Sequence, residues 1–303
     1  MWFADGHCDS VVRCLEWGAP LVGVHNFSVK RSQLQLCALF ARDRARYVAL
    51  RTAFWHAVER ERERIAQVCT FVGIKEQLRA GKHAALLSVE GGAGITSAEQ
   101  VCELYADGIR VMGLAWDSNA LATASRHRAE GIPDKGLTAL GREVVAAGNE
   151  CGMIFDVSHL SDNSFWQVLE LAEKPPGATH SCFRALCDHP RNLTDEMARA
   201  LTARNGVIGI NLYPPFLQKR AERVTLSDVL AHIAYGVSLL GERAMGLGCD
   251  IDGTDGQYPM GLSEDTSIPD ALIRALERGF PKAIVGRLVG GNWLSYFRSQ
   301  LRG

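Results

Sequence analysis

The sequence lacks any long hydrophobic run and any excess of charge of one sign. No stretch of about 18 apolar residues occurs in the chain, so we expect no transmembrane helix. Among its 303 residues, Lys and Arg total 33 against 34 Asp and Glu, which gives a net charge of −1. This balance offers no basic surface for nucleic acid or for an anionic membrane. We therefore expect neither among the partners of the chain.

The sequence also lacks the marks of a secreted, disulfide-bonded protein. The chain has 9 cysteines, an odd number, widely spaced and without a CxxC pair. Most stand in or beside apolar runs, as free buried thiols do in a reducing compartment. The N-terminus carries a charge at Asp5 and no apolar signal-peptide core, and the C-terminus has no hydrophobic tail for a lipid anchor. We therefore expect a cytoplasmic protein.

What the sequence does have is a regular alternation of short apolar runs and longer helical patterns. Hydrophobic residues make up 47% and charged residues 22%, as is usual for a globular protein. Near-continuous apolar runs, typical of buried parallel strands, lie at residues 2–9, 34–41, 83–91, 109–116, 152–159, 177–181, 206–213 and 245–252. Helices are predicted at residues 43–71, 97–107, 138–150, 162–173, 194–205 and 226–240, several of them with capping residues at their start.

Eight strands that alternate with helices over about 250 residues predict an α/β fold, a TIM-type (β/α)8 barrel. A doubly wound open sheet is the alternative. It would usually place a Gly-rich phosphate turn after the first strand, where this chain has HCDSVVR. The run at 34–41 could equally be helical, and the charged run at 59–64 is interpreted as a solvated helix face. With no linker or repeat in the sequence, we expect one catalytic domain over residues 1–303.

Polar side chains stand at the predicted C-terminal ends of five of these strands. Two of them, His7 and Asp9, are two residues apart on the first strand and therefore share one of its faces. The C-terminal ends of all barrel strands converge on one mouth, so these side chains should meet there. The set is, in chain order, His7, Asp9, Glu90, His159, His180 and Asp250.

Buried histidines and carboxylates without partners cost several kcal/mol each, so something must compensate them. One or two divalent cations would do so, and imidazole with carboxylate suits zinc, manganese or iron. Glu90 is the carboxylate that could bridge two cations. Any one of these residues alone would usually be an ordinary hydrogen-bonded side chain. Their joint occurrence at five strand ends favours a metal-dependent hydrolase.

The segments around these residues resemble one known family. The motifs are DGHCD at 5–9, SVEGG at 88–92, DVSH at 156–159, THSCFRALCDHPRN at 179–192 and GCDIDG at 248–253. They are similar to motifs of the membrane (renal) dipeptidase family of zinc dipeptidases, which is related to the amidohydrolase barrels. The similarity extends from residue 3 to residue 297, and the combination of motifs is specific although no single motif would be. The missing secretion signal and lipid anchor suit a bacterial-type cytoplasmic member.

The resemblance implies a binuclear zinc site, with Mn²⁺ or Fe²⁺ as the other cations it could hold. By motif position, His7 and Asp9 would hold one ion, and His159 and His180 the other. Glu90 would bridge the two ions. Asp250 would be the acid/base that moves a proton between the attacking water and the leaving amine.

The resemblance also implies how a substrate would bind. Arg191 would bind its terminal carboxylate, although a loop salt bridge with Asp188 or Asp195 is the alternative for this residue. Tyr213 would line the pocket. Trp116 stands where the mammalian enzymes carry a histidine thought to stabilise the oxyanion, so the oxyanion donor stays unassigned here.

These implications lead to a specific expectation of function. The chain would be a metallodipeptidase that hydrolyses free dipeptides, tolerates a C-terminal D-residue and forms a homodimer. The alternative is another metal-dependent amidohydrolase that acts on a cyclic amide, a lactone or an N-acyl amino acid; a neutral substrate would not need Arg191. A non-catalytic barrel is a third hypothesis, but the complete set of predicted ligands argues against it.

Overall fold

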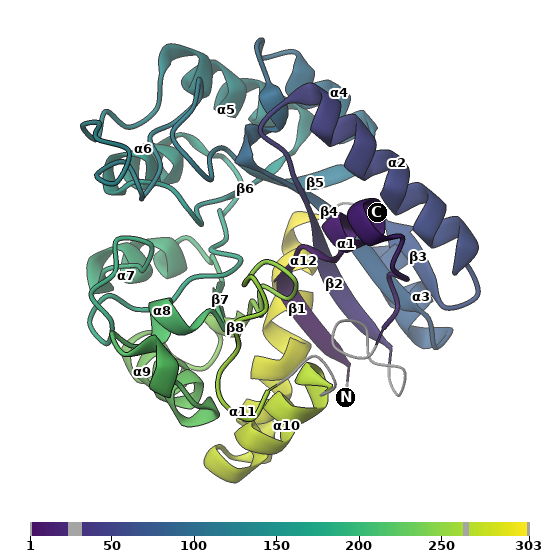
Figure 1. Cartoon of the computed structure of the whole chain (residues 1–303), viewed down its shortest axis with the longest axis vertical. Helices are drawn as coiled ribbons and strands as arrows, with labels where there is room; N and C mark the ends of the chain where they lie inside the picture. The colour runs from purple at the N-terminus through teal and green to yellow at the C-terminus, as the bar shows by residue number, and fades with distance from the viewer. Residues whose placement is uncertain (1, 24–31, 263–266, 302–303) are drawn as a thin grey trace.

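The computed structural model describes residues 2–23, 32–262 and 267–301. Within them, the strands are β1 Phe3–Cys8, β2 Gln33–Phe40, β3 Ile65–Val68, β4 His83–Glu90, β5 Ile109–Gly113, β6 Ile154–Asp156, β7 Ile208–Ile210 and β8 Met245–Leu247. The α-helices are α1 Ser10–Trp17, α2 Arg44–Arg60, α3 Phe71–Arg79, α4 Gln100–Ala106, α5 Ala139–Cys151, α6 Asp162–Leu171, α7 Asp195–Ala203, α8 Pro214–Leu217, α9 Leu226–Leu240, α10 Ile268–Gly279, α11 Lys282–Gly286 and α12 Asn292–Gln300. Figure 1 shows the strands between α2–α4 on one side and α5–α9 on the other. None of the described helices combines the length and apolarity needed to cross a bilayer.

The strands form one curled parallel sheet in the order β6-β5-β4-β2-β1-β8-β7. The segment 177–181 closes the remaining gap, because Gly177 bridges to Asp156 of β6 and Ala178 bridges to Ile208 of β7. The predicted (β/α)8 barrel is thus confirmed. The run at 34–41 is a strand, β2, and not a helix.

The strand predicted at 177–181 forms only these isolated bridges. The Asp156 side chain replaces part of the backbone hydrogen bonding between neighbouring strands here. Asp156 Oδ1 accepts hydrogen bonds from the backbone N–H groups of Ser158 and Thr179, each at 3.0 Å. The chain therefore follows the barrel wall but departs from regular strand pairing where the functional side chains begin.

The helix predicted over residues 43–71 is wrong in its second half. Helix α2 ends at Arg60, and the chain then turns into β3. Strand β3 pairs with the first half of β4, and β5 pairs with the second half of β4 along the same edge. The charged run 59–64 is therefore the end of α2 and a turn. Glu61 even points inward and accepts the backbone N–H groups of Leu21 and Val22 at 2.8 and 2.9 Å. No Gly or Pro marks this break, so only the pairing of β3 reveals it.

Helix α12 packs its aromatic face against alternate residues of the barrel strands, such as Leu34 and Leu86, in one buried cluster. Trp293 of this helix lies directly against the backbone of β1 and β8. A Cβ atom at Gly6 would lie 2.5 Å from its ring, and one at Gly246 would lie 2.6 Å from its Nε1. That Nε1 donates to the carbonyl of Leu247 at 2.8 Å. Glycine is required at both positions because the indole fills the space of a side chain.

This packing predicts a large loss of stability for Trp293→Ala. The side chain is 1% exposed, and its removal leaves a cavity and takes away the hydrogen bond from Nε1 to the Leu247 carbonyl. We expect the free energy of unfolding to fall by about 3–5 kcal/mol in urea titrations followed by circular dichroism. The matched control is Trp17→Ala, which removes an indole that is 70% exposed and should change stability by less than about 0.5 kcal/mol. Equal losses in the two variants would contradict the assignment.

Candidate active site

The polar strand ends meet at one cavity of about 330 Å³. It lies at the C-terminal ends of the strands, where a barrel of this kind carries its active site. Seven of the nine residues predicted for the site line it, and the other two, His7 and His180, are buried beside the same carboxylates. The seven are Asp9, Glu90, Trp116, His159, Arg191, Tyr213 and Asp250.

The Glu90 carboxylate lies among three imidazoles. Its Oε1 is 2.8 Å from His159 Nε2 and 3.4 Å from His180 Nε2, while its Oε2 is 3.7 Å from His7 Nε2. The side chain is 8% exposed. The two oxygens of one carboxylate therefore face different histidines, which is the arrangement that a bridging ligand needs.

His7 connects the two halves of this cluster. Its Nε2 lies 3.4 Å from Asp9 Oδ2 and 3.8 Å from Asp250 Oδ1, and its ring stacks on that of His180 with the centroids 3.7 Å apart. The donor atoms group most closely as His7–Glu90–His180 and His7–Asp9–Asp250. This grouping differs from the motif-based pairs, because His7 belongs to both sets.

Burial and mutual charge set the protonation of the cluster. Burial lowers the pKa of His159 and of His180, and the positive charges of Arg191 and His7 lower both further. Burial raises the pKa of Glu90 and of Asp250. For His7, burial acts to lower the pKa, but the charges of Glu90 and Asp9 outweigh it and the pKa is raised. The lowered pKa favours the neutral imidazole, which has a lone pair to offer, at both His159 and His180.

A hydrogen-bond relay orients His180. The Thr179 hydroxyl donates to Asp156 Oδ2 at 2.5 Å and lies 2.7 Å from His180 Nδ1. Because its only proton goes to the carboxylate, the hydroxyl accepts from His180 Nδ1–H. The tautomer that results leaves the lone pair on Nε2, which faces Glu90 and lies 2.9 Å from His159 Nε2.

These residues fit a divalent cation. Within the described part of the chain, His7 Nε2 and Asp9 Oδ1 are buried and make no hydrogen bond. Buried polar atoms without a hydrogen bond are energetically costly unless a partner of another kind, such as a metal ion, compensates them. Imidazole nitrogens and carboxylate oxygens in one dry cluster are the donor set that zinc and its neighbours prefer.

Asp250 is held beside the cluster by a buried amide and by an unusual backbone. Asn211 Nδ2 donates to Asp250 Oδ2 at 3.0 Å, which leaves Oδ1 on the side of His7. Asp250 has a φ of 56° and His159 a φ of 67°, in the left-handed region that residues other than glycine seldom adopt. Such backbone costs about 1–3 kcal/mol per residue and gathers at functional sites.

Arg191 is a buried cation, and it has no ionic partner among the residues that the structure describes. Its Nη1 donates to Ser181 Oγ and its Nη2 to the carbonyl of His180, both at 2.8 Å. No carboxylate of the described residues lies within ion-pair distance of it, so the alternative of a loop salt bridge with Asp188 or Asp195 is not formed. Asp195 instead accepts the Tyr235 hydroxyl at 2.7 Å.

Sequence reasoning did not assign roles to several residues of this site. Thr179 and Asn211 orient His180 and Asp250, and Arg126 and Phe216 line the cavity. Thr179 had a detectable signal in the sequence. It directly precedes His180 at the end of a predicted strand, and Ser181 follows, so three polar residues stand together there. Arg126 lies in a loop, where no periodicity marks it.

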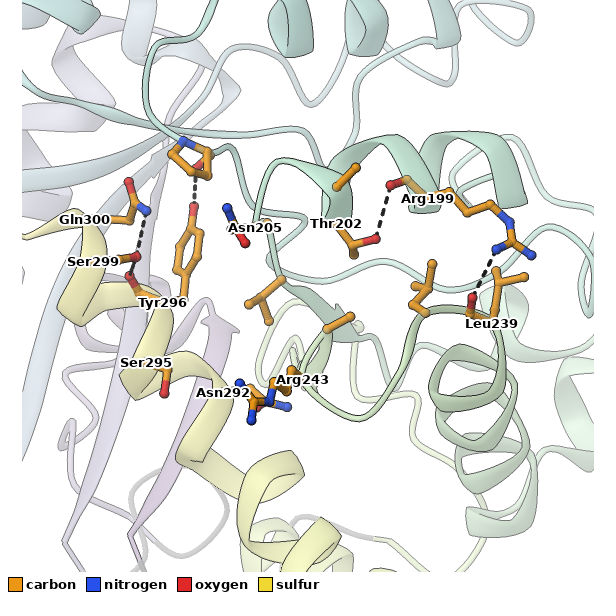
Figure 2. Close-up of a pocket in the computed structure, with 16 residues that line it drawn as sticks. Arg199, Thr202, Asn205, Leu239, Arg243, Asn292, Ser295, Tyr296, Ser299 and Gln300 are labelled. Atoms are coloured by element: carbon orange, nitrogen blue, oxygen red, sulfur yellow. Dashed lines mark hydrogen bonds between the residues drawn. The ribbon is translucent and has the colours of Figure 1, made fainter.

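A larger cavity of about 740 Å³ lies at the opposite end of the strands, beside Val207 and Ala244 (Figure 2). Residues of α7, α9 and α12 line it, among them Arg199, Tyr296 and Gln300. Among the described residues, no histidine or carboxylate lines this cavity, so they offer it no donor set for the chemistry described above.

Three imidazoles and three carboxylates at the mouth of a parallel α/β barrel define a metal-dependent hydrolase. Residues 28–301 match the model of the membrane dipeptidase family, peptidase family M19, and the chain belongs to that family. The family and the enzyme class, a metallodipeptidase, agree with the resemblance seen in the sequence.

Individual relatives are consistent with this family. An uncharacterised protein in the pqqA 5′ region of Klebsiella pneumoniae is 31% identical over 241 residues, which cover 77% of this chain and 88% of that protein. An uncharacterised dipeptidase of Schizosaccharomyces pombe is 34% identical over 201 residues, 65% of this chain and 48% of that protein, so the match spans about half of the fungal relative. A metallopeptidase from Rhodobacter sphaeroides has a similar fold, with a TM-score of 0.88, 21% identity and 99% of each chain covered.

The relay to His180 predicts a metal-affinity effect of Thr179→Val. Valine keeps the shape of threonine but cannot accept a hydrogen bond from His180 Nδ1–H. The His180 ring is then held less firmly, and the basicity of its Nε2 falls. We expect metal affinity to fall about 10–100-fold in competition with a chromophoric chelator. The control is Thr202→Val, whose hydroxyl donates to the carbonyls of Ala198 and Arg199 within α7, at 2.9 and 3.2 Å. Unchanged affinity in Thr179→Val would remove the relay from the site.

Proposed function

We propose that this chain hydrolyses free dipeptides with two zinc ions at the barrel mouth, and that it accepts a D-residue at the C-terminal position. The observation that carries the proposal is the combination of two features in one cavity. A buried cluster of imidazoles and carboxylates lies beside the buried guanidinium of Arg191, which has no carboxylate partner in the described part of the chain. The first feature suits metal-assisted hydrolysis, and the second suits a substrate with a free carboxylate.

The proposed metal ligands are His7, Asp9, Glu90, His159 and His180. Glu90 is the proposed bridge, because its two oxygens face His159 and His7 separately. Divalent cations held here would polarise the scissile carbonyl and make water a nucleophile near neutral pH. Mn²⁺ or Fe²⁺ would suit the same donors.

The substrate carboxylate is proposed to bind Arg191. A guanidinium forms strong, oriented hydrogen bonds with carboxylates, and burial excludes the water that would screen them. Tyr213 and Phe216 pack edge to face with centroids 4.8 Å apart and form the adjoining wall. Asp255, on the loop after β8, lines the cavity outside the metal cluster and offers a charge for the free amino group of the substrate. A cavity of about 330 Å³ suits a dipeptide better than a longer peptide.

Asp250 is the proposed acid/base. Its Oδ1 faces the cluster while Asn211 holds Oδ2, so one oxygen is free to accept a proton from the attacking water and pass it to the leaving amine. Trp116 lies with its ring 5.8 Å from that of His159 and forms a wall of the cavity. Its role is proposed as packing around the substrate.

The first experiment is hydrolysis of a dipeptide panel by the full chain. We expect cleavage of L-Ala-L-Ala and L-Ala-D-Ala that is lost on chelation and returns with zinc. The D-residue is included because the R. sphaeroides structure contains a phosphinate mimic of L-Ala-D-Ala. C-terminally amidated L-Ala-L-Ala should be cleaved poorly, because it offers no carboxylate to Arg191.

Two results would argue against the proposal. Cleavage of an N-acyl amino acid but of no dipeptide would favour another amidohydrolase reaction. Equal cleavage of the free and the amidated dipeptide would remove the carboxylate contact with Arg191.

Replacement of the acid/base should separate turnover from metal binding. We expect Asp250→Asn to lower kcat by at least about 100-fold, because asparagine cannot accept the proton. The metal content, measured by elemental analysis, should stay at the wild-type value. Asp188→Asn, which changes an exposed carboxylate, serves as the control with normal turnover. Loss of metal from Asp250→Asn would make Asp250 a ligand instead, as its place in the His7–Asp9–Asp250 group allows.

A further inference from the structure

A second guanidinium lines the cavity in addition to Arg191. Arg126 lies in the turn that follows β5, and its Cζ is 4.6 Å from the centre of the Trp116 ring. The preceding residue anchors this turn to the site, because the Ser125 N–H donates to the carbonyl of His159 at 2.7 Å. The cation is therefore placed beside the metal cluster by two independent contacts.

Neighbouring side chains hold Arg126 without using up its donors. Its Nε is 3.4 Å from Glu130 Oε1, and the Glu130 carboxylate also accepts the backbone N–H of Ser118 at 3.2 and 3.3 Å. Neither Nη group donates a hydrogen bond to any residue that the structure describes. The planar fork is thus oriented by the Trp116 face and by Glu130, with its outer edge available to a ligand.

Arg42 offers an instructive contrast. Its Cζ also stacks on Trp116, at 4.9 Å from the ring centre, but its Nε is 2.7 Å from Asp117 Oδ2 and it does not line the cavity. Two arginines therefore flank one indole, and the carboxylate beside Arg42 is closer than the one beside Arg126, at 2.7 Å against 3.4 Å. Arg126 is the member of the pair that lines the cavity.

We propose that Arg126 selects free dipeptides with a carboxylate in one side chain. The inference rests on the proposed function, in which Arg191 binds the terminal carboxylate of the substrate. A dipeptide with neutral side chains then leaves the outer edge of the Arg126 guanidinium without a ligand, whereas an aspartyl or glutamyl residue supplies a second anion for it. Two guanidinium groups on different loops, after β5 and after segment 177–181, match two carboxylates on one small molecule.

The test compares glutamate with its neutral isostere in each position of the dipeptide. The full metal-loaded chain is assayed with Glu-Ala against Gln-Ala and with Ala-Glu against Ala-Gln. We expect kcat/KM to favour glutamate about five-fold in one of the two positions, mainly through KM, as a partly exposed ion pair allows. Added salt should reduce the preference.

Three variants assign the preference to Arg126. Arg126→Gln should bring the Glu/Gln ratio to about one, and Arg126→Lys should restore part of it, because lysine keeps the charge but loses the fork. Arg128→Gln is the matched control: this arginine is exposed in the same turn, does not line the cavity and should leave the ratio at the wild-type value. A role of Arg126 in loop structure alone would lower all four rates together and leave their ratios unchanged.

The outcomes also separate this inference from the proposed function. Cleavage of the glutamine dipeptides without any preference for glutamate would overturn the role of Arg126 and leave the dipeptidase intact. A glutamate preference that persists in Arg126→Gln would do the same. If the metal-loaded chain cleaved none of the four dipeptides, the proposed function would fail and the inference with it.

Discussion

The burial of Glu90 among three histidines is the constraint on which the site depends. Each of these groups would cost several kcal/mol to bury alone, so the barrel must bring all of them together or none. Their convergence follows from the parallel sheet, since every strand delivers its C-terminal end to the same mouth. The register of β1 against β2 shifts between Asp5 and Cys8, in the part of β1 that carries His7.

Each side chain of the site must be held in one orientation as well as brought to the barrel mouth. Thr179 and Asp156 fix His180, and Asn211 fixes Asp250. Asp252, two residues after Asp250, accepts the Ser10 hydroxyl at 2.6 Å and pairs with Arg13 at 3.0 Å, which ties the loop after β8 to α1. The contact of Asn211 with Asp250, and those of Ser10 and Arg13 with Asp252, offset the cost of the left-handed backbone at Asp250.

The sequence predicted the barrel and the gathering of histidines and carboxylates at its mouth because both follow short-range rules. Apolar runs reveal buried strands, and a polar residue at the end of such a run stands out. The prediction failed where structure depends on distant partners. Nothing between 43 and 71 marks the break before β3, whose four residues become a strand only by pairing with β4. Segment 177–181 looked like a strand, but Asp156 takes one of its backbone hydrogen bonds.

Strand ends and loops therefore contribute different parts of the function. The strand ends supply the proposed metal donors, and their spacing in the sequence is tied to the barrel itself. The loop after β5 supplies Trp116 and Arg126, whose positions are set by side-chain contacts with Glu130 and His159 rather than by strand geometry. Because loops tolerate change more readily than barrel strands, substrate selection can vary while the hydrolytic chemistry stays constant. Trp116 connects the two parts of the site, because its ring packs beside that of His159 and also contacts the guanidinium of Arg126, which lines the cavity.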